Sequence, residues 1–524
     1  MVKRINLNSM NMVYICFMIV YMAIREVLPL NFIVSNALLS ATIFAVGAIL
    51  IGMDLLTSRN CLKGKTQDLL ILFLLICGIS SIINIKFGFV SNVKMIGTLI
   101  IEYFIFFSFA KCNTKEELNK KLNLITATLT IVWSIIVLFS VFMYFFNIDI
   151  IIAGRGTWGQ ANQGFSNEYL RLWGILQDPN YAGATSIVSL FASVRFFWMI
   201  KKVGIRILNA LNVLLQVMYI ILCGSRAAFL LLMLVILFFV VYRFLFSIDK
   251  KSFKQVARGI LVSIITTTIC ITSIFSIKAA IPYVKAYCFP QNTQISKFVA
   301  SAYVKLYDAS GYKFMLLSPK YDGLTGNISS DDFFDMQDFY DENSDNPIIE
   351  NIDRTDIKED DISNGRFKRW KQTLEIFLNA PIFGTSPRNL SEFAKEHNPE
   401  TIIAIYDIAP HNGYIDVLAG TGIIGFVVIA LACIFVLTSI LKDYLKNGFS
   451  QNRAFLLLAI LVLMGIAFFV SDIFLVFSIN SLLFWCLLGI AYNYGKDDVS
   501  DGCCYTLFSK TIGKLIDKKL SKKG

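Results

Sequence analysis

Long apolar runs separated by short polar connectors make up most of the chain between residues 10 and 494. The runs hold about 20 residues each, and a helix of that length crosses the ~30 Å hydrocarbon core of a bilayer. A soluble domain would instead interrupt its apolar positions with polar ones every few residues. The pattern therefore predicts about twelve transmembrane helices, with their backbone hydrogen bonds satisfied inside each helix.

The polar connectors differ in charge, and this difference predicts their sides of the membrane. Lysine and arginine gather in connectors that are each separated from the next by two apolar runs. These connectors are the N-terminus with Lys3 and Arg4, residues 59–65, 111–121, 201–206, 250–258 and 442–453, and the tail from Lys496. Because short cytoplasmic loops carry an excess of Lys and Arg, the spacing predicts that both termini are cytoplasmic.

These observations predict an all-α fold, a polytopic membrane helix bundle. We expect an N-terminal transmembrane bundle of about nine helices at 1–277 and a large extracytoplasmic loop with amphipathic helices at 278–411. Residues 412–494 are expected to form about three further transmembrane helices, and 495–524 a basic cytoplasmic tail.

Composition supports this interpretation and excludes others. The chain is 56% hydrophobic and only 16% charged, whereas soluble domains are about a quarter charged. The net charge of +11 does not indicate nucleic-acid binding, because residues 278–411 hold 14 Lys and Arg against 20 Asp and Glu, which leaves +17 in the short connectors. The acid-rich stretch at 331–361 is typical of a solvated surface. The chain has only two histidines, so a histidine-rich metal site is not expected.

Gly224-Ser225-Arg226 joins two apolar runs on the predicted outer side. Ser225 can cap the following helix, which places Arg226 in its first turn. Free backbone N–H groups, the positive helix end and a forked guanidinium together suit a phosphate. The alternative is an interfacial arginine that reaches lipid headgroups.

A second polar group precedes another helix that starts on the predicted outer side. Asp178 stands in capping position, Pro179 stands where a first-turn proline is tolerated, and Arg171 and Arg155 lie upstream. Either arginine could contact an anion. The alternative is a capped helix beside a solvated arginine.

The end of the long loop contains two further candidates. Apolar residues at helical spacing predict an amphipathic helix that Ser363 or Asn364 caps and Pro381 ends, with its apolar face on the bundle mouth or the membrane interface. His411 opens the next helix, where a neutral imidazole could accept a proton; a capping or lipid-facing histidine is the alternative. Glu102, inside the fourth apolar run, should have a partner or a wet cavity.

Together these pieces resemble the O-antigen polymerase and O-antigen ligase superfamily of bacterial envelope enzymes. The resemblance covers residues 170–426, where four groups occur in the family's order and at its topological positions. They are Arg171 with Asp178-Pro179-Asn180; Gly224-Ser225-Arg226; Gly365-Arg366 with Trp370, Pro381 and Gly384; and Pro410-His411-Asn412 with Gly420, Gly422 and Gly425.

The resemblance implies metal-independent, inverting glycosyl transfer from an undecaprenyl-diphosphate-linked glycan at the outer face of the bacterial inner membrane. No metal or cofactor is implied. The expected partners are the lipid-linked oligosaccharide as donor and acceptor, the bilayer and a chain-length regulator, with no nucleic acid. By position, the implied catalytic residues are His411, Arg226 and Arg366, and the implied diphosphate or glycan contacts are Arg171, Arg155, Arg369, Asn180 and Asn412.

Three reactions share this scaffold: polymerising repeat units, ligating a finished glycan to a lipid core, and transferring it to protein. The long acidic loop and the Ile-, Lys-, Asn- and Phe-rich composition favour a polymerase. A flippase for lipid-linked sugars has a similar helix count, but the two halves of this chain show no convincing repeat and the candidate residues gather at the outer face. A cell-wall glycan polymerase of the shape, elongation and division type is a more distant alternative.

Overall fold

The computed structural model describes residues 7–111, 113–146, 148–153, 160–166, 170–247, 253–289, 363, 365–470 and 473–494. In this part of the chain nine helices are long and apolar enough to cross a membrane, and three further apolar helices are shorter. The prediction of a helical, polytopic membrane protein with about twelve apolar helices is therefore confirmed.

The chain forms two compact units, each made from separate stretches of sequence. The first unit comprises residues 1–20, 37–128 and 363–524, and the second comprises residues 21–36 and 129–362. Helices α1 (Leu7–Arg25) and α6 (Lys115–Phe145) pass from one unit into the other. The predicted division at residues 277 and 411 follows membrane sidedness, which these units do not test.

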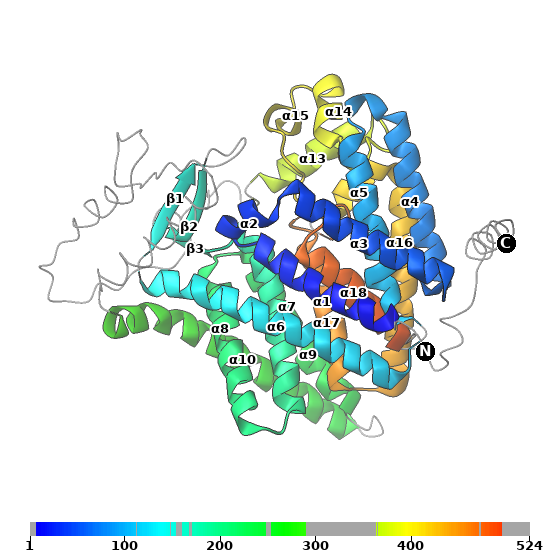
Figure 1. The fold of residues 1–524 in the computed structure, drawn as a ribbon. Helices are drawn as coiled ribbons and strands as arrows, with labels where there is room; N and C mark the ends of the chain where they lie inside the picture. The colour runs from blue at the N-terminus through cyan, green and yellow to red at the C-terminus, as the bar shows by residue number, and fades with distance from the viewer. Residues whose placement is uncertain are drawn as a thin grey trace, which may run out of the picture. The chain divides into compact units, whose positions relative to one another are not determined.

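The other elements of the first unit are helical (Figure 1). They are α3 (Ala37–Leu56), η1 (Asn60–Leu62), α4 (Lys65–Ile83), η2 (Ile85–Phe87), α5 (Val90–Ile101), η3 (Glu102–Phe107), η4 (Ser108–Ala110), α13 (Arg366–Phe377), α14 (Leu390–His397), α15 (Ile402–Tyr406), α16 (Gly413–Asn447), α17 (Gln451–Ile466) and α18 (Ile479–Tyr494).

The second unit adds a small sheet to its helices. Its elements are α2 (Leu28–Val34), β1 (Asp149–Ala153), β2 (Gln160–Ser166), β3 (Arg171–Gly174), α7 (Pro179–Met199), α8 (Val203–Leu222), α9 (Arg226–Ser247) and α10 (Phe253–Cys288). The strands pair antiparallel in the order β1-β2-β3. This sheet was not predicted, although the β-branched run Ile150–Ile152 in β1 favours a strand.

Polar side chains inside the second unit hydrogen-bond to one another. The Trp133 indole donates to Ser186 Oγ at 2.9 Å, and the Asn212 amide donates to Ser193 Oγ at 2.7 Å. Interhelical bonds of this kind stabilise membrane bundles by about 0.6 kcal/mol each. They matter here because the burial of apolar side chains contributes little to helix association in lipid. They fix how α6, α7 and α8 pack.

Glu102, in the first unit, has one hydroxyl partner, while its Oε1 atom is buried without a hydrogen bond among the described residues. The residue starts a π-helical turn in the middle of the fourth span, and its side chain is 1% exposed. Its carboxyl group hydrogen-bonds to the hydroxyl of Ser481, in the first turn of α18. The hydroxyl offsets part of the cost of placing a carboxyl group in hydrocarbon.

Helix α16 is broken at Gly422, which has φ 68° and ψ −177°. The turn after α13 crosses the break, and the backbone groups that the break frees bond to this turn. Ile423 N donates to Pro381 O at 2.9 Å, and Thr385 N donates to Ala419 O at 2.8 Å. A non-helical backbone is tolerated at membrane depth only where protein satisfies it, as it does here.

The glycines at this crossing allow two backbones to touch. A Cβ atom on Gly384 would collide with the backbone of Gly422 and Ala419, and one on Gly422 would collide with Ile382 O. Asn84 Nδ2, at the end of α4, donates to Gly384 O at 2.9 Å and holds the crossing turn in place. Glycines from two separate motifs of the sequence therefore form one structural feature.

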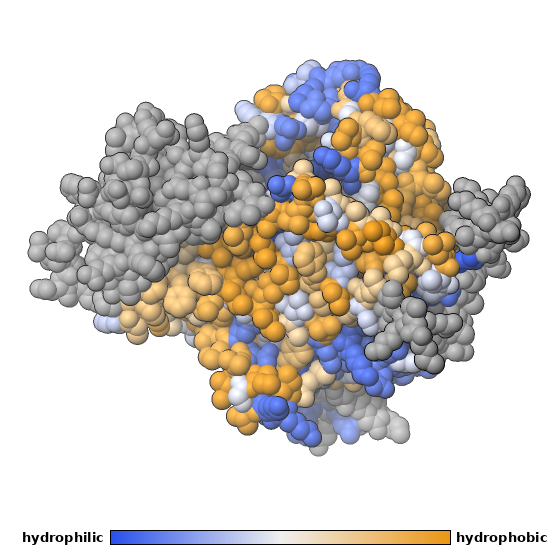
Figure 2. All heavy atoms as spheres, viewed as in Figure 1, coloured by the Kyte–Doolittle hydropathy of each residue, from blue (hydrophilic) through white to orange (hydrophobic). Residues whose placement is uncertain are grey.

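The predicted amphipathic helix is α13, and the Ser363 hydroxyl accepts from Phe367 N at 3.3 Å near its start. Asn364 lies outside the described residues. Ile376 is buried against α14 and α15, whereas Phe367 and Leu378 are 66% and 71% exposed. Of the other apolar residues at the predicted helical spacing, Trp370 and Phe377 are partly buried, so the stripe is only in part packed against protein. Figure 2 shows hydrophilic side chains over α14 and hydrophobic ones along α4.

Candidate active site

Helix α7 begins as its sequence predicts. Asp178 is the N-cap and accepts from Asn180 N at 2.6 Å, and Pro179 occupies the first turn. A capping carboxylate satisfies one of the otherwise unpaired N–H groups of the first turn. This cap fixes where the Asn180 side chain projects.

Arg171 lies in β3 and binds two other elements of the second unit. Its Nε donates to the carbonyl of Cys223 at 2.6 Å, and its Nη2 donates to Asn180 Oδ1 at 2.8 Å. The guanidinium carbon lies 5.0 Å from the centre of the Trp173 ring, and the residue is only 6% exposed. Because Cys223 ends α8, the cation meets the negative end of that helix. Arg171 therefore connects β3, α7 and α8.

Arg226, three residues after Cys223, is the first residue of α9. Gly224 has φ 62°, and Ser225 caps the helix by accepting from Ala228 N at 3.4 Å. The turn packs against α7 at Gly183, where a Cβ atom would lie 2.8 Å from that of Ala228. The Ser225 cap is as predicted. The structure thus brings Arg171, Asn180 and Arg226 together around one turn.

Arg155 and Lys285 are two other cations in the sequence of the second unit. Arg155, predicted as a substrate contact, lies outside the described residues. Lys285 in α10 was not predicted; it is 6% exposed, and its ammonium group lies 4.5 Å from the Tyr144 ring and 5.8 Å from the Phe165 ring. An amine held over two aromatic faces is stabilised as a cation. Its sequence signal was a lysine near the end of an apolar run.

In the first unit, Arg366 is the first residue of α13. The preceding Gly365 has φ 77°, and the Arg366 guanidinium carbon lies 5.8 Å from the Phe469 ring. Arg369, one turn further along, is partly buried, and this burial lowers its pKa from the ordinary value. Arginine still carries its charge at neutral pH, because its unperturbed pKa is above 12. Both predicted arginines of α13 are therefore cations near the start of this helix.

His411 immediately precedes the cap of α16. It has φ 53°, a left-handed conformation that costs a residue with a side chain roughly 1 kcal/mol or more. Asn412 Oδ1 accepts from Tyr414 N at 3.0 Å and from Ile415 N at 3.1 Å. The imidazole therefore projects from the turn before α16 and not from the helix itself. The Asn412 oxygen caps the helix, which is a structural function that the implied substrate contact did not include.

Residues 467–469, at the end of α17, contact both the start of α13 and the start of α16. Ala467 O accepts from Gly413 N at 2.7 Å, while Phe469 lies beneath Arg366. The Tyr414 ring lies 4.4 Å from the Phe468 ring. The starts of α13 and α16, which carry Arg366 and His411, are thus held on one short segment.

The candidate residues form two groups, one within each unit. Arg171, Asn180 and Arg226 belong to the second unit, and Arg366, Arg369, His411 and Asn412 to the first. Among the residues that the structure describes, no three His, Cys, Asp or Glu side chains are grouped to hold a metal ion. The acidic stretch at 331–361 lies outside them, so metal independence stays a prediction.

The structure defines a polytopic helical membrane protein in which Arg226 and Arg366 are each the first residue of a helix. In a comparison with protein families, residues 211–430 match the family model described as O-antigen ligase. The predicted resemblance to the O-antigen polymerase and ligase superfamily is confirmed over this segment, which is less than half of the chain. The match includes Arg226, Arg366 and His411, whereas Arg171 and Asn180 precede it. A comparison with the curated proteins finds no match.

Proposed function

We propose that this protein polymerises undecaprenyl-diphosphate-linked oligosaccharide repeat units at the outer face of the bacterial cytoplasmic membrane. The product would be an O-antigen, a capsular polysaccharide or an exopolysaccharide. One observation carries the proposal: Arg226 and Arg366 are each the first residue of a helix, and both lie in the segment that matches the family.

The chemistry of a helix start explains why this observation matters. The first N–H groups of a helix have no partner within the helix, and they form the positive end of its dipole. An arginine there adds a fixed charge and forked donors that match a phosphate. A diphosphate leaving group carries two to three negative charges, and an arginine at a helix start can stabilise part of that charge without a divalent cation.

In the proposed step, a hydroxyl oxygen of the acceptor repeat unit attacks the anomeric carbon of the donor glycan. A new C–O bond forms while the bond between that carbon and the diphosphate oxygen breaks, and the leaving oxygen keeps the electron pair. The hydroxyl proton passes to His411, which contributes about 10²–10⁴ in rate as a general base. Attack opposite the leaving group inverts the anomeric carbon.

In our proposal Arg171 does not contact the substrate but holds the turn that precedes Arg226. Its Nε and Nη2 hydrogen-bond to Cys223 O and Asn180 Oδ1. We therefore assign Arg171 as a positioning residue that sets the turn before Arg226. Lysine in its place would keep the charge but lose the two-directional fork.

Polymerase and ligase differ in the acceptor. The long acidic loop and the biased composition of the sequence favour a chain specialised for one repeat unit, and therefore a polymerase. The ligase remains the second candidate, because the matching family is described as O-antigen ligase. A ligase would transfer the finished glycan to a lipid core and would not extend repeat units on their own.

The test is reconstitution of the purified protein with the lipid-linked repeat unit as the only sugar substrate. A ladder of lipid-linked products supports the polymerase. No extension until a lipid-core acceptor is added would overturn it in favour of the ligase.

Arginine variants then test the site itself. Arg226→Ala and Arg366→Ala should each lower polymerisation at least tenfold at normal protein level, and lysine should restore part of the activity. Lys371→Ala is the matched control, since Lys371 lies on α13 and its side chain is 82% exposed. Wild-type polymer from either alanine variant would remove that arginine from the proposed site.

A further inference from the structure

The helices α7 and α8 and their connection carry basic residues and no acidic ones. Residues 179–222 contain Arg195, Lys201, Lys202 and Arg206 but no Asp or Glu. Lys201 and Lys202 are exposed and directly precede the first residue of α8. This connector lies on the side that the positive-inside pattern predicts to be cytoplasmic.

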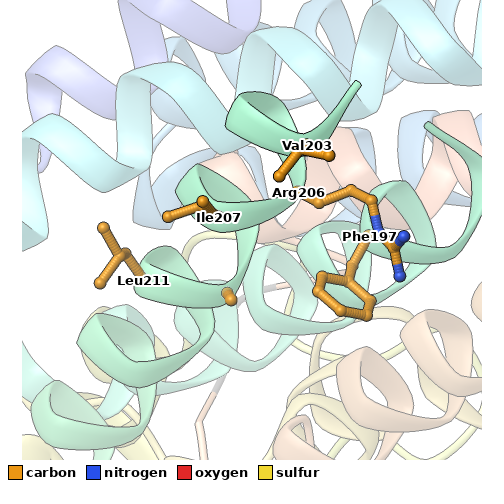
Figure 3. A pocket seen from close by; sticks show the side chains of 6 residues that line it. Phe197, Val203, Arg206, Ile207 and Leu211 are labelled. Atoms are coloured by element: carbon orange, nitrogen blue, oxygen red, sulfur yellow. The ribbon is translucent and has the colours of Figure 1, made fainter. Parts of the chain in front are cut away.

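A cavity of about 360 Å³ opens beside these charges. It is lined by one cation and five apolar residues, namely Arg206, Phe197, Val203, Ile207, Ala210 and Leu211. Figure 3 shows the Arg206 side chain running alongside the Phe197 ring, with Val203, Ile207 and Leu211 projecting from successive turns of α8. The cavity therefore has a charged end and an apolar wall.

Arg206 has hydrogen-bonding capacity left over. Its guanidinium carbon lies 4.7 Å from the centre of the Phe197 ring. Its Nε is buried and has no hydrogen-bond partner among the described residues. A buried donor without a partner costs about 1–3 kcal/mol, which an acceptor on a ligand would recover. No side chain caps the start of α8, so its first-turn amides are also available to an anion.

The apolar wall extends away from the charges along the outside of α8. Val203, Ile207 and Leu211 follow one another at four-residue spacing, and they are 68%, 54% and 57% exposed. Trp198, which is 53% exposed, stands at the same end of the hairpin, as is usual at a membrane interface. This row suits a hydrocarbon chain, and the arginine with its two lysines suits a phosphate.

We propose that the α7–α8 connection binds one anionic phospholipid. Arg206 holds the phosphate, Lys201 and Lys202 add charge at the mouth of the cavity, and an acyl chain lies along Val203, Ile207 and Leu211. A free phosphate would leave the apolar wall unused. A zwitterionic lipid would bring its own cation next to three others.

Lipid binding can be measured directly on the full-length protein. Purified protein is incorporated into nanodiscs of phosphatidylcholine that contain a minor fraction of phosphatidylglycerol. The lipids that stay bound after gentle release into detergent are then counted by native mass spectrometry. We expect one retained phosphatidylglycerol per chain on the wild type and at least tenfold weaker retention on Arg206→Ala. Arg258→Ala, an exposed arginine near the start of α10, is the matched control and should keep the lipid.

A second variant tests the apolar wall without touching the charges. Leu211→Glu places a carboxylate on an exposed position of the acyl path, so it should weaken retention while the unfolding temperature stays within the range of the Arg258→Ala control. Equal retention by Arg206→Ala and Arg258→Ala would overturn the proposal. It would also be overturned if phosphatidylcholine were retained as well as phosphatidylglycerol, or if inorganic phosphate displaced the lipid while Leu211→Glu had no effect, which would indicate a simple phosphate site.

Discussion

Replacing Gly422 by alanine tests the broken helix directly. Gly422 has φ 68° and ψ −177°, a region that only glycine enters readily, and residues with a side chain pay about 1–3 kcal/mol there. The added Cβ would also overlap Ile382 O and Phe383 N, so the crossing turn must move. That movement pulls Pro381 O and Ile382 O from the amides of Ile423 and Ile424.

The backbone strain and the lost hydrogen bonds together determine how far Gly422→Ala should destabilise the protein. Each lost hydrogen bond costs about 1 kcal/mol on average, and more where no water replaces it. Adding the backbone strain gives a destabilisation of about 3–5 kcal/mol for Gly422→Ala. This is a large fraction of the typical stability of a folded protein.

Gly78→Ala is the matched control for this measurement. Gly78 lies inside α4, and a Cβ atom there would meet nothing within 4 Å. Alanine should be neutral or stabilise by up to about 1 kcal/mol, since glycine is a poor helix former. The assay compares the apparent unfolding temperatures of the two variants in one detergent at one scan rate, because large membrane proteins unfold irreversibly. If Gly422→Ala unfolds where Gly78→Ala does, α16 is not broken in the way described.

Three further expectations concern the proposed chemistry and topology. His411→Ala should lower turnover by a factor of ~10² or more. His397→Ala should keep full activity and lose local contacts with Phe393 and Phe87; equal rates would make His411 structural. Polymerisation should continue in a chelator, and activity restored only by Mg²⁺ would contradict the arginine-based mechanism. In intact cells whose native cysteines have been replaced, an impermeant thiol reagent should label Ser344→Cys, which lies outside the described residues, and spare Lys446→Cys; the reverse pattern would invert the topology.

Local sequence patterns predicted where the helices of this protein begin better than they predicted the contacts between helices. Asp178 and Ser225 cap α7 and α9 as expected, because capping depends on residues within one turn. The bond from Arg171 to Cys223 O joins positions 52 residues apart and uses a backbone atom, so no side-chain pattern encodes it. The orientation of α13 was also not predictable from its sequence, since in a membrane protein an apolar stripe can face lipid as readily as a core.

Hydrogen bonds between the matched segment and the rest of the chain limit how the segment can be exchanged between related proteins. The turn before Arg226 depends on Arg171, which precedes residue 211, and Ser80 Oγ donates to Gly420 O at 3.2 Å from α4. A chimera that exchanges residues 211–430 alone would therefore separate the family segment from two of its supports. Exchanges that include β3, the start of α7 and α4 should yield folded hybrids, so the proposed repeat-unit specificity can be mapped by exchanging those elements as a set.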